Sequence, residues 1–420
     1  MTRTTRFSLV AAPLALGFVL AGCAPTTGEP APPAPSATEA ASDAQGPADE
    51  DDHGLIPGAE EVAEPQSQLV SVAADGSVGL LDLLTGEETE LGTVGTPSDI
   101  ASDGRYAFVT TKDGATVIDG GRWSWDHGDH FHYYRATPAL AGTIPGSGPV
   151  HVTGSPLSTA GGTGLFFDGS GEAVLIDNSA LSDGEITETL RIDTGAESGV
   201  VAPIGDGAIV ATHGGALADT AQFFGADGEP VDGASAACIA PSGAITTRVG
   251  TVVGCEDGAL IAVTNGDGID ISMVEYPDGA TRTESFSGRK NRPTVSGVDG
   301  DGGFWLLSTR SRAWQHVDTD QDLVIATTAD NADGHVVALD TDGRIIVFSE
   351  DGEQLAETEP IVADSLVDGA HVDLVVDQQR AYLSAPSEGV VYEIDYADGA
   401  RIARELTPSV SPDFATELGR

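Results

Sequence analysis

The sequence predicts an all-β protein folded as a β-propeller with seven or eight blades, and we favour eight. From Gln68 onward, short runs of β-forming residues alternate with Asp-Gly or Gly turns, such as Asp75-Gly76 and Asp398-Gly399, which is the pattern of β-hairpins. The pattern repeats roughly every 40 residues with about four strands per unit, as in propeller blades. No convincing amphipathic helix interrupts these strands.

Eight units can be marked along the chain from residue 69. The first unit, 69–94, lacks one strand, and we expect the tail around Pro412–Ala415 to supply it and close the ring. The other units are expected to begin near Ser98, His151, Val200, Cys238, Thr294, His335 and His371. Seven blades are the alternative, because the stretch 256–290 is irregular. A β-sandwich would need fewer strands, or two domains with a linker, and no linker follows residue 65.

The charge of the chain argues against several classes of function. The 420 residues include 66 acidic and 19 basic side chains, for a formal charge of −47. Nucleic-acid binding needs clustered Lys and Arg, and this chain has two lysines, Lys112 and Lys290. The acidic excess also argues against docking on an anionic lipid surface through protein charge. It suits a cation-rich setting or a cationic partner, or keeps an exported protein soluble.

Residues 1–23 have the features of an export signal. Two arginines precede an apolar run, 7–20, which is too short to span a bilayer comfortably. The run ends in Leu20-Ala21-Gly22-Cys23, which resembles a bacterial lipobox. The resemblance implies that Cys23 is acylated and becomes the mature N-terminus, so that lipid holds the protein at the extracytoplasmic face of the cell membrane. The alternative is a transmembrane anchor.

The segment 24–65 is expected to be a disordered acidic and Pro-rich tether, followed by a single propeller domain over 66–420. The tether shows no periodic apolar pattern, so it cannot bury enough surface to offset its ordering entropy. Its run Asp49-Glu50-Asp51-Asp52-His53 could collect divalent cations weakly, although such runs are more often solvated charge.

After Cys23 the chain has two cysteines, Cys238 and Cys255. An even pair in an exported protein is typical of one disulfide. The segments 244–249 and 251–253 predict an antiparallel hairpin, which brings the position before its first strand and the end of its second strand to the same rim. We therefore predict a Cys238–Cys255 disulfide rather than a cysteine-based metal site.

The most distinctive string of the chain runs from Trp125 to Arg135 and holds three of the nine histidines within six residues. His130 and His132 are two residues apart, so on a strand both imidazoles point to one face. A glycine between His127 and Asp129 lets the chain turn and brings His127 round.

The donor set of this string favours zinc. We predict that His127, His130 and His132, helped by Asp129, bind one Zn²⁺, because imidazoles with a carboxylate suit this cation. Asp126 and Asp129 are each available as an oxygen ligand or as a partner that fixes an imidazole tautomer. The alternatives are a polar surface hairpin or a pH-sensing patch.

Three further histidines, His151, His335 and His371, stand at the predicted starts of first strands. First strands line the channel of a propeller and begin at one rim, so these histidines are expected to converge there, with His213 near the same rim. Each alone is more typical of a polar channel residue than of a ligand. His151 is also our candidate for a fourth ligand of the 127–132 site. In standard blade topology that cluster joins strands three and four at the rim away from the starts of the first strands. His151 would reach it only in an irregular blade.

The histidine string has two companions, Phe166-Phe167-Asp168-Gly169-Ser170-Gly171-Glu172 and Gly254-Cys255-Glu256-Asp257-Gly258. Together they resemble the AztD-type periplasmic zinc chaperones and their lipoprotein relatives, over most of residues 68–410. The resemblance implies a β-propeller that binds zinc and hands it to the solute-binding protein of a zinc ABC importer. Two strings depart from the family: Glu197-Ser198-Gly199 and Pro241-Ser242-Gly243 stand where relatives often carry histidines. This favours the 127–132 cluster, or a rewired set using His213, over a channel site.

Three hypotheses for the function follow. The chain is a zinc chaperone or zinc store, or a non-metal propeller that presents loops to another envelope protein, or an enzyme acting on sugars or lactones. We expect no enzyme, because no Gly-x-Ser-x-Gly elbow occurs and the glycine strings are turns rather than phosphate loops. Stoichiometric zinc in the purified protein separates the first hypothesis from the other two.

Overall fold

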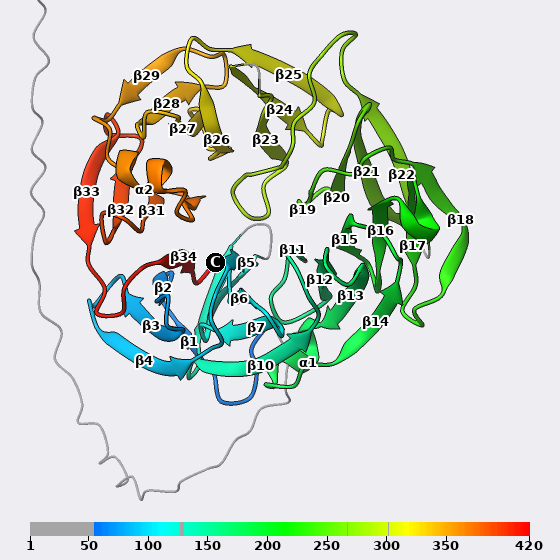
Figure 1. Ribbon diagram of the computed structural model, residues 1–420, viewed down its shortest axis with the longest axis horizontal. Helices are drawn as coiled ribbons and strands as arrows, with labels where there is room; N and C mark the ends of the chain where they lie inside the picture. The colour runs from blue at the N-terminus through cyan, green and yellow to red at the C-terminus, as the bar shows by residue number, and fades with distance from the viewer. Residues whose placement is uncertain (1–53, 127–129, 267, 301) are drawn as a thin grey trace, which may run out of the picture. The chain divides into compact units, whose positions relative to one another are not determined.

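Eight β-sheets follow one another around a central channel, so the fold is an eight-bladed β-propeller (Figure 1). A computed structural model describes residues 54–126, 130–266, 268–300 and 302–420. The expected export signal, the expected lipidation site Cys23 and most of the expected tether lie outside these residues. In the described part of the chain, no helix is both long and apolar enough to cross a bilayer.

Each of the first four blades has four antiparallel strands, ordered from the channel outward. Blade one comprises β34 (Phe414–Leu418), β2 (Gln68–Val72), β3 (Ser77–Asp82) and β4 (Glu88–Thr93). Blade two comprises β5 (Asp99–Ser102), β6 (Tyr106–Thr111), β7 (Gly114–Asp119) and β10 (Ala139–Pro145). Blade three comprises β11 (Val150–Gly154), β12 (Gly162–Phe167), β13 (Glu172–Asp177) and β14 (Glu188–Asp193). Blade four comprises β15 (Ser198–Ile204), β16 (Gly207–His213), β17 (Thr220–Phe224) and β18 (Pro230–Ala237).

The remaining blades follow the same order, except that blade six has three strands. Blade five comprises β19 (Ala244–Thr246), β20 (Thr251–Cys255), β21 (Gly258–Asn265) and β22 (Gly268–Glu275). Blade six comprises β23 (Thr294–Val298), β24 (Gly303–Ser308) and β25 (Ala313–Asp318). Blade seven comprises β26 (Leu323–Thr328), β27 (His335–Asp340), β28 (Ile345–Ser349) and β29 (Gln354–Glu357). Blade eight comprises β30 (Leu374–Val376), β31 (Ala381–Ala385), β32 (Val390–Asp395) and β33 (Arg401–Leu406). Short helices α1 (Asn178–Ser182), η1 (Gly215–Leu217) and α2 (Ala363–Asp368) lie in connections.

The C-terminal strand closes the ring. β34 pairs antiparallel with β2, from Gln68 opposite Leu418 to Val72 opposite Phe414. Blade one is thus built from both ends of the domain, and the predicted role of the tail is confirmed. The strand is well placed to stabilise the closure, because Leu418 is fully buried with Val70 and Val109 between blades one and two.

The blades bury both of their faces against one another. Every residue of β6 and of β12 is buried, which explains why these strands have continuous apolar runs rather than alternation. Outer strands such as β4 are largely exposed. The apolar clusters each lie mainly between two neighbouring sheets.

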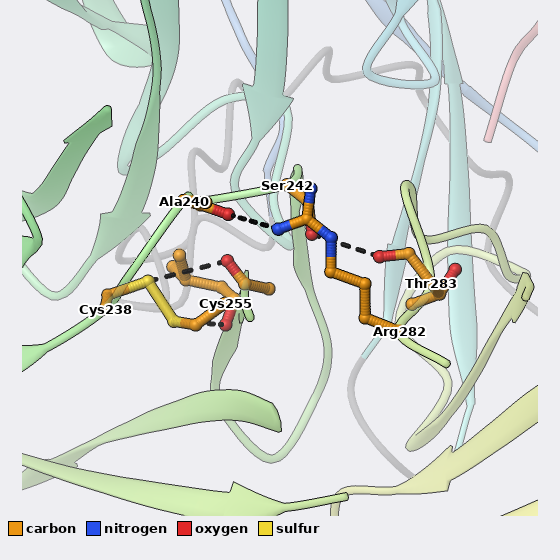
Figure 2. The surroundings of a disulfide bond; sticks show 8 residues. Cys238, Ala240, Ser242, Cys255, Arg282 and Thr283 are labelled. Carbon is orange, nitrogen blue, oxygen red and sulfur yellow. Dashed lines mark hydrogen bonds between the residues drawn. A yellow bond between two sulfur atoms is a disulfide. The ribbon is translucent and has the colours of Figure 1, made fainter. Parts of the chain in front are cut away.

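The predicted disulfide is present between blades four and five (Figure 2). Cys238 directly follows β18, and Cys255 ends β20, with Cα atoms 5.1 Å apart. The loop after Cys238 also supports the segment that connects blades five and six. Arg282 Nη1 donates to the carbonyl of Ala240 at 3.0 Å, and Ser242 Oγ donates to the carbonyl of Thr283 at 3.1 Å.

One expected blade boundary is wrong. We expected blade seven to begin at His335, but its first strand is β26, and His335 begins the second strand. The physical reason is that β26 pairs with β27 and not with β25, so that blade six has no fourth strand. The irregular stretch 256–290 divides into β21, β22 and a long connection. The ring therefore has eight blades and not the alternative seven.

Candidate metal centre

The histidine string belongs to a small sheet of its own. β8 (Arg122–Asp126) and β9 (Phe131–Arg135) form a hairpin inserted between β7 and β10 of blade two, and β1 (Glu60–Val62) pairs with β9. The hairpin leaves the blade where β7 ends, beside the point where the first strand β5 ends. We call this side of the propeller the hairpin rim, and the side where first strands begin the opposite rim.

A buried tryptophan fixes the base of this hairpin. Trp123 stacks on Tyr134 with ring centroids 5.4 Å apart, and the guanidinium of Arg105 lies 4.0 Å from its ring centroid. Its Nε1 donates to the carbonyl of Gly54 at 3.0 Å. Arg105 is in turn held by Asp119 through two hydrogen bonds of 2.9 and 2.7 Å. The base is therefore rigid, and the exposed end of the hairpin is presented from it.

His130 and His132 come together as the spacing predicted. Their Nε2 atoms are 3.0 Å apart and their ring centroids 4.9 Å apart. On the other side of its ring, His132 Nδ1 lies 2.7 Å from Glu61 Oε1, a contact made possible by the pairing of β1 with β9. A carboxylate can only accept, so Nδ1 of His132 carries the proton and the lone pair of its Nε2 points toward His130.

The geometry of the pair fits a tetrahedral cation. Two nitrogens that each lie about 2.0–2.1 Å from one tetrahedral zinc are about 3.3 Å apart, close to the 3.0 Å between the two Nε2 atoms. A hydrogen bond at this distance requires a proton between the two nitrogens, and the tautomer of His132 assigns it to Nε2 of His130. It must move to Nδ1 of His130 before both Nε2 lone pairs can bind one metal ion. Glu61 acts on His132 as carboxylates do behind metal-bound imidazoles, by fixing the tautomer.

The rest of the predicted ligand set is not brought together by the described residues. His127 and Asp129 lie outside them. Within 54–126, 130–266, 268–300 and 302–420, no group of three or more His, Cys, Asp or Glu side chains is arranged to hold a metal ion. Oδ2 of Asp126 accepts from Arg248 Nη2 at 2.5 Å. The observed core of the candidate site is thus His130, His132 and Glu61.

The structure does not bring His151 to this pair. It is the second residue of β11, at the opposite rim, and its Nε2 lies 3.0 Å from Asp168 Oδ2. Standard blade topology therefore holds, and His151 does not join the hairpin. His213 ends β16 opposite Ser198, at the same rim as His151, as expected.

His371 also lies at the opposite rim, whereas His335 does not. Nδ1 of His371 is 3.0 Å from Asp99 Oδ1. Burial alone would lower the pKa of His371, but the hydrogen bond to Asp99 and the charges of Asp99 and Asp373 raise it above its ordinary value. His335 is buried at the start of a second strand, with Nδ1 2.8 Å from the amide nitrogen of Asn331. The expected convergence of His151, His335 and His371 is wrong for His335.

Glu61 is the residue that the sequence analysis missed. It falls in the range assigned to the tether, and a strand of three residues, Glu60–Val62, is too short to show a period. The one sequence feature that could have pointed to a role for Glu61 is the adjacent pair Glu60-Glu61. Arg135 of β9 forms an ion pair with Glu60, and His132 of the same strand contacts Glu61. Both glutamates therefore bind side chains of β9.

Comparison with known proteins establishes the class of fold and one particular likeness. No family model matches the chain. The fold is that of a β-propeller, and NirN, a dihydro-heme d1 dehydrogenase solved in complex with DHE, covers 87% of this chain and 78% of its own, with a TM-score of 0.51 at 14% identity.

More specifically, the chain has the fold of AztD. Apo AztD from Citrobacter koseri covers 85% of this chain and 98% of its own, with a TM-score of 0.70 and 19% identity. A crystal structure of the same organism's AztD covers 84% and 98%, with a TM-score of 0.70 and 20% identity. At such identities the likeness concerns the fold, and at that level the resemblance to AztD-type proteins is confirmed.

Proposed function

We propose that this protein is an extracytoplasmic, lipid-anchored zinc chaperone that delivers zinc to the solute-binding protein of a zinc ABC importer, and that it is not an enzyme. The observation that carries the proposal is the pair of Nε2 atoms of His130 and His132, 3.0 Å apart, with Glu61 on the far nitrogen of His132. The shared fold with AztD supports it. The hairpin ligands His127 and Asp129 complete the proposed site.

The position of the pair suits transfer rather than storage. His130 is exposed, and the side chain of Glu61 keeps 54% of its surface exposed. An exposed site allows the ligands of a partner to replace the hairpin ligands one at a time, so that the zinc ion is never released to water. The acidic surface, with a formal charge of −47 over the chain, attracts cations toward the protein before they bind.

Transfer is the activity to test. Zinc-loaded protein is mixed with the metal-free solute-binding protein of the importer, the two are separated, and zinc is measured in each. We expect wild type to load its partner and the His130→Ala, His132→Ala double variant to fail. His213→Ala is the matched control, because it removes an exposed imidazole at the opposite rim. Equal transfer by the double variant would refute the assignment of the site.

The anchor is tested separately. In cells, Cys23→Ala should release the protein from the membrane into the soluble exported fraction, because the substitution removes the only proposed site of acylation. Fractionation and immunoblotting measure the outcome. Retention on the membrane at an unchanged level would show that another anchor holds the protein. That outcome would not bear on the proposed zinc transfer, which is measured in solution.

A further inference from the structure

A pocket lies at the hairpin rim, and its charge is opposite to that of the protein as a whole. It has a volume of about 490 Å³ and lies between the hairpin β8–β9, the ends of β30 and β34, and the connection from β22 to β23. Six of its 22 lining residues are basic, against four acidic ones, while the chain has 19 basic and 66 acidic residues. The basic residues are Arg289, Lys290, Arg292, Arg380, Arg404 and Arg420.

Three of these cations come from the connection 276–293, which reaches into the middle of the ring (Figure 1). In Figure 1 the segment between β22 and β23 runs from the right-hand side toward the middle of the ring. Lys290 Nζ donates to the carbonyl of Asp103 at 2.6 Å and to Ser158 Oγ at 3.0 Å, while Arg289 Nη1 donates to the carbonyl of Ala329 at 3.3 Å. The loop therefore touches blades two, three and seven, and its cations are held in the channel.

The other three basic residues each lie against an acidic side chain. Arg380 and Arg404 both form ion pairs with Glu393, and Arg420 forms one with Glu417. No such pair is found for Arg289, Lys290 or Arg292 among the residues that the structure describes. The Nε of Arg292 is buried and has no hydrogen-bond partner there.

Holding these cations without a direct ion pair is unfavourable. Burial lowers the pKa of Lys290 to about 8, and burial together with the charge of Arg292 lowers the pKa of Arg289. Charged groups that are partly removed from water need a partner of opposite sign. A bound anion would supply it, and a planar guanidinium is well suited to carboxylate and phosphate oxygens.

We propose that this pocket binds a small organic anion that carries a carboxylate or phosphate group, held by Arg289, Lys290 and Arg292. The pocket volume of about 490 Å³ agrees with this proposal, because pockets for small molecules measure about 300–1,000 Å³. Phe131 and Tyr133 provide an aromatic wall, with rings 6.3 Å apart and nearly parallel. They alternate along β9 with His130 and His132, so the anion faces one side of the strand and the imidazoles the other.

The site is independent of zinc and is tested on metal-free protein. Isothermal titration measures the binding of inorganic phosphate and, in a second arm, of citrate, with sodium chloride at equal ionic strength as the reference. We expect saturable binding of at least one probe, and Arg292→Gln should weaken it about tenfold or more, because a hydrogen bond to a charged group is lost. The preferred probe identifies the head group.

Two controls keep the outcome decisive. Arg401→Gln removes one positive charge that pairs with Asp395 and Asp398 outside the pocket, and it should bind the probe as wild type does. If Arg292→Gln is unstable in a thermal melt, Arg289→Gln replaces it. Absence of binding at millimolar concentrations of both probes, or equal affinity in wild type and the pocket variant, would overturn the proposal. The His130→Ala, His132→Ala variant should retain anion binding, which separates this test from that of zinc transfer.

Discussion

The Cys238–Cys255 disulfide should contribute about 3 kcal/mol to the free energy of unfolding. The two residues are 17 positions apart, and the loop-closure entropy that a crosslink of this length removes from the unfolded chain gives about 3 kcal/mol. Both cysteines are buried, with exposed fractions of 0% and 1%, in the apolar cluster between blades four and five. The bond therefore joins the end of one blade to the second strand of the next.

Denaturant unfolding of four proteins tests this number. Wild type is compared with Cys238→Ala, Cys255→Ala and the double variant, and midpoints are converted to free energies with the measured slope. If the crosslink is the main contribution, each single variant loses about as much as the double variant, because removing either sulfur opens the loop. Wild type under reducing conditions should then fall to a similar level.

A different result would point to packing instead of chain entropy. If the losses of the two single variants add up in the double variant, the two side chains act independently and the estimate from loop length fails. A fully reduced wild type that unfolds at the same midpoint as the oxidised protein would refute the reasoning outright.

Three further predictions concern other parts of the molecule. Glu61→Gln should weaken zinc binding by about 10- to 100-fold at unchanged stoichiometry, because the carboxylate that orients an imidazole ligand is lost; competition titration measures it. Burial raises the pKa of Glu417 to about 7 from its ordinary 4.5 despite Arg420 nearby, so the folded state holds this proton more tightly than the unfolded chain. Metal-free wild type should therefore lose about 3 kcal/mol of unfolding free energy as the pH rises from about 4.5 to about 7, and Glu417→Gln should lack that loss. Leu418→Ala in the closing strand should cost about 2–5 kcal/mol in denaturant unfolding, whereas Leu355→Ala, 47% exposed, should cost far less.

The fold was predictable because its turns and its buried strands are local signals. Asp-Gly turns separate short apolar runs, and most runs pair with their neighbours in the chain. The strand order of blades three, four and five follows directly from this. The closing strand was predictable for another reason: unit one lacked a strand, and the tail 412–415 could supply one.

The start of blade seven was not predictable in this way. The strand 323–328 follows β25 at the usual interval, so the sequence does not tell whether it ends blade six or begins blade seven. Its pairing with β27 is decided by packing against the neighbouring blades, which no local pattern records. His335 was misplaced for that reason alone.

The candidate site was half predictable. The alternation of a strand placed His130 and His132 on one face, and blade topology correctly set His151 at the opposite rim. Glu61 lies 69 and 71 positions before these histidines in the sequence, and only the pairing of β1 with β9 brings it to His132. The unpaired cations of the channel were equally hidden, because Arg289, Lys290 and Arg292 form one short string in an acidic chain and their surroundings come from three other blades.

Zinc stoichiometry tests the central claim most directly. Metal-free protein is titrated with zinc in competition with a chromophoric chelator, for wild type, the His130→Ala, His132→Ala double variant and the control His213→Ala. We expect the double variant to lose about one zinc equivalent, since two of the imidazole ligands of a tetrahedral site are gone, while the control keeps the full number. An unchanged stoichiometry and affinity in the double variant would contradict the claim.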